Sequence, residues 1–181
     1  MVQRRPIVGV MGSHAKADAD RACRVGVWIA SQGYHLLTGG GGGVMETVAQ
    51  AFTTVRGRSG RSIGVLPSIS GDPGCRPVPG YPNAWIEIPI LTNLAGLGVR
   101  GDQSGSRNHI NILTSTVVLV LAGGEGTASE ARLALRYGRP CIAYLDRRDD
   151  VPTLPEAIGV EQRFDRVQAF VRAAIAASNR V

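Results

Sequence analysis

The sequence lacks the features that mark membrane, disulfide-rich and secreted proteins. No apolar run reaches the roughly 18 residues that a bilayer-spanning helix needs. The opening residues lead into a strand-like Ile7–Met11 rather than a signal peptide. The three cysteines (Cys23, Cys75 and Cys141) lie far apart without a CxxC pair, which argues against a disulfide framework or a zinc knuckle. We therefore expect a cytoplasmic protein that contacts no membrane, with Cys23 and Cys141 buried as small apolar residues.

Metal ligands and nucleic-acid-binding patterns are also scarce. The three histidines (His14, His35 and His109) are dispersed, and none has acidic or cysteine neighbours at ligand spacing, so no metal site is predicted. The net charge is +6, but the arginines are scattered without a basic stripe or interleaved aromatic residues. We expect no nucleic acid partner, and we attribute the excess positive charge to an anionic ligand and a solvated surface.

Glycine, by contrast, is abundant, with 24 residues among 181, and the apolar content of 44% suffices for one full core. Strand-like and helix-like segments alternate along the chain, which predicts an α/β fold: a doubly wound, mostly parallel sheet flanked by helices. Residues 1–181 should form a single Rossmann-like domain. The predicted strands are Pro6–Met11, Tyr34–Leu37, Ser62–Leu66, Trp85–Ile88, Thr116–Leu121 and Cys141–Leu145. The predicted helices are Ala17–Ser31, Val44–Thr54, Ser106–Ser115, Thr127–Tyr137 and Asp165–Ser178.

A glycine turn after the apolar strand Thr116–Leu121 is the main functional motif. Gly123, Gly124 and Gly126 allow a tight turn into the helix Thr127–Tyr137. The N-terminus of such a helix offers free N–H groups and the positive end of its dipole, so it suits an anion such as phosphate.

A second glycine turn, Gly39–Gly43, follows the predicted strand Tyr34–Leu37 and leads into Val44–Thr54. Five glycines in succession exceed the needs of a turn and predict close approach of the backbone to a bulky group. Neither turn is followed by Lys-Ser/Thr, which argues against a P-loop NTPase. No acidic residue stands about 20 positions further on in a second-strand context, which argues against a dinucleotide dehydrogenase.

The two turns resemble those of the LONELY GUY, or "lysine decarboxylase-like", superfamily. Its Gly-Gly-x-Gly-Thr-x-x-Glu motif stands here as residues 123–130, and its Thr-Gly-Gly-rich turn followed by Val-Met stands as residues 38–45. The resemblance spans about Ile7 to Leu145. It implies either a nucleoside 5′-monophosphate (cytokinin riboside) phosphoribohydrolase or a molybdenum cofactor carrier. Lysine decarboxylation is not expected, because the only lysine is Lys16.

Two departures separate this chain from the phosphoribohydrolases. Arg107 and Glu130 match the family's catalytic pair, but Asn108 replaces its lysine and Ala122 its proline. The segment from Ser106 to Asn111 looks more like the molybdenum cofactor carrier branch. The resemblance therefore favours a binding protein over an enzyme, and Arg107 and Glu130 are catalytic only in the second case.

Each key residue also has a structural interpretation. Thr127 and Glu130 fit a capping box, in which case Glu130 would stabilise its own helix; as a catalytic group it would act as an acid or base. Arg107 could be an ordinary surface arginine, but its place just before a central strand favours binding of a ligand phosphate or carboxylate. Asn108 could bind ligand or hold its loop, and His14 is expected to be a solvated turn residue.

The sequence thus predicts a phosphate-binding site for a nucleotide-like or pterin-like ligand, with no required cofactor. The bound ligand would be the molybdenum cofactor or a nucleoside monophosphate, and the protein a dimer or tetramer. The apolar side of Asp165–Ser178 packs either on the sheet or on a second subunit, and the sequence does not decide which. The predicted ligand-binding residues are Gly12, Ser13, Gly39, Gly40, Gly41, Gly42, Gly43, Val44, Met45, Arg107, Asn108, Gly123, Gly124, Gly126, Thr127 and Glu130. The irregular stretch from Pro67 to Pro82 should lie at the sheet edge or over the ligand.

Overall fold

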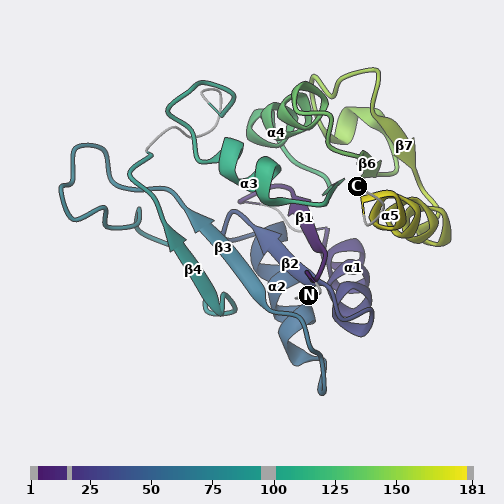
Figure 1. Ribbon diagram of the computed structural model, residues 1–181. Coiled ribbons are helices and arrows are strands. Elements are labelled where there is room, and N and C mark those ends of the chain that lie inside the picture. Colours follow the sequence, from purple (N-terminus) through teal and green to yellow (C-terminus); the bar gives the residue numbers. More distant parts are fainter. Residues whose placement is uncertain (1–3, 16–17, 95–100, 179–181) are drawn as a thin grey trace.

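The computed structural model describes residues 4–15, 18–94 and 101–178, and its centre is one sheet of seven parallel strands (Figure 1). The strand order is β4-β3-β2-β1-β5-β6-β7. The strands are β1 (Ile7–Met11), β2 (His35–Thr38), β3 (Ser62–Leu66), β4 (Ile88–Leu91), β5 (Val117–Val120), β6 (Cys141–Tyr144) and β7 (Gly159–Glu161). The single α/β domain with a doubly wound parallel sheet is confirmed.

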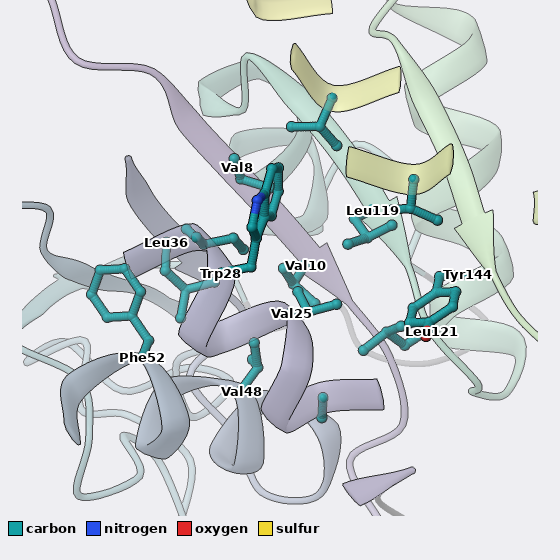
Figure 2. Packing of buried hydrophobic residues seen from close by; sticks show 14 of the residues in the cluster. Val8, Val10, Val25, Trp28, Leu36, Val48, Phe52, Leu119, Leu121 and Tyr144 are labelled. Carbon is teal, nitrogen blue, oxygen red and sulfur yellow. The ribbon is translucent and has the colours of Figure 1, made fainter. Parts of the chain in front are cut away.

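Helices cover both faces of the sheet. Those of the described residues are α1 (Ala19–Ser31), α2 (Val44–Thr54), α3 (Asn108–Thr114), α4 (Glu125–Arg136) and α5 (Phe164–Ser178). On one face, α1, α2 and α5 enclose a core around Trp28, Phe52 and Leu119 (Figure 2). On the other face, α3 and α4 cover Val118 and Val120. Adjacent residues of β5 thus point to opposite cores, which explains why this strand is apolar throughout.

The strand order changes direction at the centre of the sheet. From β1 the chain builds outward through β2 and β3 to β4, then returns to place β5 on the other side of β1. In such sheets the loops after two neighbouring strands diverge, and a crevice opens at their carboxyl ends. Here that crevice lies beyond Met11 of β1 and Val120 of β5, which pair directly.

Two strand predictions need correction. Trp85–Ile88 is not a strand, because β4 begins only at Ile88 and runs to Leu91. Residues 95–100, which follow β4, lie outside the described part of the chain. The three-residue β7 was not predicted, and it pairs with β6 at the sheet edge.

Helix starts and burial also differ from expectation. The side chain of Asp18 caps α1 by accepting a hydrogen bond from Arg21 N. Ala17, where the helix was predicted to begin, lies outside the described residues. Helix α3 begins at Asn108, with Arg107 as its N-cap, rather than at Ser106. Of the two cysteines that were predicted to be buried, Cys23 is exposed and Cys141 is half-buried. The apolar side of α5 packs on the sheet, so it is not free for a second subunit. None of the helices in the described part of the chain has the length and apolar character to cross a bilayer.

Candidate functional site

A cavity of about 380 Å³ opens at the carboxyl ends of β1 and β5, where the direction of the strand order changes. Its volume is that of a small-molecule site. It is lined by Gly12, Ser13, His14, Ala15, Met45, Tyr81, Arg107, Asn108, Gly124, Gly126, Thr127 and Glu130. Segments from five parts of the chain thus meet at the position that the topology favours for a ligand.

The first turn of α4 forms one wall of this cavity. The helix begins at Glu125, with Gly124 as N-cap and no side-chain hydrogen bond to the cap. The predicted capping box is therefore wrong: Thr127 lies inside the helix, and its N–H donates to Gly124 O at 3.0 Å. The N–H groups of the first residues of a helix lack intrahelical acceptors and carry partial positive charge, so this wall suits an anion.

The turns after β1 and β5 are joined by their backbones. Ser13 N donates to Ala122 O at 2.9 Å, and Val44 N at the start of α2 donates to Ser13 O at 2.8 Å. A Cβ at Gly123 would lie 2.8 Å from the Cβ of Thr127 and 3.0 Å from Ser13 N. Gly123 therefore serves close packing of these turns.

The five-glycine turn packs against protein groups rather than lining the cavity. A Cβ at Gly41 would lie 2.6 Å from His14 Nδ1 and 2.8 Å from Tyr81 Cε1, and one at Gly39 would lie 2.6 Å from Arg107 Nη2. The bulky groups that this backbone approaches are therefore the side chains of His14, Tyr81 and Arg107, which line the cavity.

Polar backbone atoms of this turn also find partners within the protein. Asn83 donates from its backbone N to Gly40 O at 2.8 Å and from Nδ2 to Gly41 O at 2.7 Å. Gly42 N donates to His14 Nδ1 at 3.2 Å. At the end of the turn, Gly43 has a φ of 61° and precedes α2 as its N-cap. The turn is a fixed support beneath the cavity.

Arg107 provides the positive charge of the cavity wall. Its side chain is only 4% exposed, and Nη1 donates to Gly39 O at 2.8 Å and to Val65 O at 2.6 Å. Its guanidinium carbon lies 5.6 Å from the centre of the Tyr81 ring. Burial lowers the pKa of Arg107, while the charge of Glu130 acts in the opposite direction. Arginine nevertheless stays charged in proteins, so a fixed cation lies in the wall.

Glu130 is the second ionisable group at this depth. It is 8% exposed, and its Oε1 accepts a hydrogen bond from Asn111 Nδ2 at 3.0 Å. Burial raises the pKa of Glu130 to about 7, although Arg107 and the bond from Asn111 act in the opposite direction. A carboxyl group with this pKa can exchange a proton near neutral pH.

Asn108 ties the start of α3 to α4. Its Nδ2 donates to Ser129 Oγ at 3.3 Å, and Ser129 Oγ donates to Gly126 O at 2.7 Å. Asn108 also lines the cavity, so the two interpretations of this residue are compatible.

His14 and Tyr81 form an aromatic pair at the cavity that the sequence did not reveal. Their rings are stacked with centres 5.4 Å apart and planes 10° from parallel, and Tyr81 OH lies 3.3 Å from His14 Nδ1. His14 is exposed, as expected of a turn residue, but it faces the cavity. Tyr81 comes from the predicted irregular stretch, which does reach over the site.

The structure brings most of the predicted ligand-binding residues together. Those that line the cavity are Gly12, Ser13, Met45, Arg107, Asn108, Gly124, Gly126, Thr127 and Glu130. The others, Gly39–Gly43, Val44 and Gly123, lie behind this lining. The lining residues that the prediction omitted are His14, Ala15 and Tyr81. Over residues 4–15, 18–94 and 101–178, no group of three or more His, Cys, Asp or Glu side chains is arranged to hold a metal ion.

Comparison with known proteins points to the same superfamily. The chain is 30% identical to the molybdenum cofactor binding protein from Rippkaea orientalis, with a TM-score of 0.74 over 96% of this chain and 99% of that one. It is 29% identical to the molybdenum cofactor carrier protein of Chlamydomonas reinhardtii, with a TM-score of 0.71 and the same coverage. An uncharacterized protein of Archaeoglobus fulgidus is 28% identical over 135 residues, which are 73% of this chain and 75% of the relative.

A family model settles the relationship. The model described as the SLOG cluster4 family matches residues 5–171, which include every strand and all lining residues of the cavity. The resemblance of the glycine motifs to the LONELY GUY superfamily is thereby confirmed. The chain belongs to the SLOG cluster4 family.

Proposed function

We propose that this protein binds and carries a small phosphorylated ligand with a flat ring system, such as the molybdenum cofactor or a nucleoside monophosphate. One observation carries the proposal: a buried arginine, Arg107, and the first turn of α4 meet in the wall of one cavity. Both groups attract anions, and together they suit a phosphate better than either alone.

The other residues that line the cavity suit the flat ring system of the ligand. His14 and Tyr81 present aromatic surface at the cavity, and flat heterocycles stack favourably on such side chains. The similarity to two molybdenum cofactor binding and carrier proteins over nearly the whole chain favours a pterin over a purine. In this proposal the cofactor is cargo, bound through its phosphate and ring.

A second function is favoured by one specific observation. Because Glu130 combines burial with a pKa of about 7, it could act as an acid or base on a ligand in the cavity. The protein would then hydrolyse a nucleoside 5′-monophosphate to the free base and ribose 5-phosphate, with Arg107 holding the phosphate. The asparagine at 108, where the phosphoribohydrolases have lysine, weighs against this alternative.

Native mass spectrometry separates the two functions. The purified protein is measured directly for co-purified ligand, for molybdenum content and for pterin fluorescence. It is then incubated with AMP and GMP, and with the nucleosides adenosine and guanosine as controls that lack phosphate. Retention of a phosphorylated ligand without release of base supports the carrier, whereas free base that disappears in Glu130→Gln supports the hydrolase. A protein that neither retains a phosphorylated ligand nor releases free base contradicts both.

The contribution of Arg107 is tested in the same assay. Because charge-assisted hydrogen bonds contribute about 1.5–3 kcal/mol, Arg107→Met should weaken binding of the retained ligand by about tenfold or more. Arg136→Met, on the exposed side of α4, removes the same charge outside the cavity and should leave affinity unchanged. Equal affinity in both variants would remove Arg107 from the site.

We further propose that the protein is a homo-oligomer, a dimer or a tetramer. On the edge strand β4, Ile88 and Leu91 are 43% and 58% exposed, which supports an apolar contact there rather than on α5. Size-exclusion chromatography with light scattering measures the mass directly, and a monomer at micromolar concentration contradicts the proposal.

A further inference from the structure

Asn111 is a buried amide whose two polar atoms are unequally satisfied. Its side chain is 0% exposed on α3, and Nδ2 donates to Glu130 Oε1 across the α3–α4 interface. Its Oδ1 is also buried, yet nothing in the described part of the chain donates a hydrogen bond to it. Buried polar atoms without a partner are uncommon in folded proteins, so this one requires an explanation.

The two protonation states of Glu130 offer an explanation for the unpaired Oδ1. An ionised carboxylate only accepts hydrogen bonds, whereas a protonated carboxyl group also donates one. An asparagine amide has a donor end and an acceptor end of nearly the same shape, so turning it by 180° exchanges them. Nδ2 can donate to either form of Glu130, because the neutral acid keeps an accepting carbonyl oxygen, whereas Oδ1, once turned toward the carboxyl group, can accept the O–H that only the neutral form has.

We propose that Asn111 is a positioning residue that holds the Glu130 carboxyl group in the cavity in both of its protonation states. Its amide turns over whenever Glu130 takes up or releases a proton. The orphaned Oδ1 is then the acceptor kept for the protonated state, and Glu130 keeps one position while its charge changes.

Among the groups that face Glu130 in the described part of the chain, Asn111 is the one with a hydrogen bond to the carboxyl group. Arg107, the N-cap residue of α3, faces Glu130 with its charge, and its Nη1 donates to the carbonyl groups of Gly39 and Val65. Tyr81 faces it from the stretch before β4, and burial raises the pKa of this phenol, so it stays neutral. His14 lines the same cavity from the turn after β1.

The change of charge matters for the ligand, a step that rests on the proposed function. With Glu130 ionised, its charge and that of Arg107 cancel in the cavity wall; with Glu130 protonated, the positive charge of Arg107 remains. A phosphate is therefore held more tightly when Glu130 is neutral, and binding takes up a proton. Asn111 allows this uptake without moving the carboxyl group out of the ligand's reach.

Nuclear magnetic resonance on the ligand-free protein tests the inference. The side-chain carboxyl carbon of Glu130 and the side-chain NH₂ signals of Asn111 are followed from pH 5 to 9. We expect both to change with one common midpoint, and we expect the Asn111 signals of Glu130→Gln to stay constant. Asn111 signals that do not follow the titration of Glu130 would overturn the proposal.

A variant provides a second readout. Asn111→Leu removes a strong, charge-assisted hydrogen bond from ionised Glu130 and a weaker hydrogen bond from neutral Glu130. Because the ionised form loses more, the titration midpoint of Glu130 should rise by about one pH unit. Ser115→Ala is the control: Ser115 Oγ donates to the backbone O of Asn111 and does not touch Glu130, so the midpoint should stay. An unchanged midpoint of Glu130 in Asn111→Leu overturns the proposal. If this variant does not fold, the titration of the Asn111 signals in the wild type and in Glu130→Gln decides. Because no ligand is present, failure here is distinct from failure to bind phosphate.

Discussion

Replacing Glu130 by glutamine should change how the stability of the protein depends on pH. Burial holds the carboxyl group protonated in the folded protein up to about pH 7, whereas the unfolded chain releases the proton near the ordinary value of 4.5. Between these two values the folded state binds more protons than the unfolded state, so raising the pH favours unfolding. The contribution is fully present below pH 4.5 and is lost as the pH rises to about 7.

The size of this effect follows from the two pKa values. At about 1.4 kcal/mol per pH unit, the interval from 4.5 to about 7 corresponds to about 3 kcal/mol. That is a large part of the total stability of a typical domain, about 5–15 kcal/mol. Glutamine cannot ionise and keeps the hydrogen-bonding shape of the protonated acid, so Glu130→Gln should avoid the loss.

Urea denaturation at pH 5 and pH 8 measures the difference. The free energy of unfolding of Glu130→Gln minus that of the wild type should increase by about 2–3 kcal/mol between these two pH values, because a small part of the loss has already occurred at pH 5. Glu156→Gln, at an exposed position, controls for the removal of one charge and should show no such change. A difference between Glu130→Gln and wild type that is constant from pH 5 to 8 would refute the burial argument for Glu130.

Two further substitutions test the support of the site and the pH dependence of stability at the start of β2. Gly39→Ala should displace the Arg107 guanidinium, because the new Cβ would lie 2.6 Å from Nη2, and should lower both the melting temperature and the affinity for the retained ligand. The control is Gly159→Ala, where a Cβ meets nothing within 4 Å, and it should change neither quantity. Burial lowers the pKa of His35, whose Nδ1 accepts a bond from Arg61 N, so stability should be full above the ordinary value of 6.5 and fall as the pH drops below it. His35→Gln should flatten this part of the stability profile in thermal melts from pH 5 to 8, and an unaltered slope would contradict the assignment.

The local sequence was sufficient to predict the bounds of a helix or strand where glycine or proline marks its ends. Val44–Thr54 and Ser62–Leu66 were predicted at their observed bounds, since Gly43 precedes the helix and Pro67 follows the strand. The wrong strand Trp85–Ile88 shows the limit of this reasoning. Its aromatic and branched residues resemble a strand, but the register with β3 selects Ile88–Leu91, and Pro89 is tolerated because β4 is an edge strand.

The same limit applies to the site. The Gly123–Glu130 motif indicated the right edge of the sheet, because a glycine turn between a buried strand and a helix has few alternatives. Asn111 could not be recognised, since its bond to Glu130 spans 19 residues and depends on how α3 packs on α4. Tyr81 is likewise brought to His14 across 67 residues. Contacts of this kind follow from tertiary packing, which no local pattern encodes.

The glycine turn beneath the cavity has a consequence for how a ligand arrives. Its backbone is already bonded to Asn83, His14 and Arg107, so this side of the site holds its shape before any ligand is present. A ligand then loses little affinity to the ordering of this wall, and such preorganisation strengthens binding without additional contacts. Under the proposed function, the ligand would therefore meet a wall that is already formed and could bind in a single step.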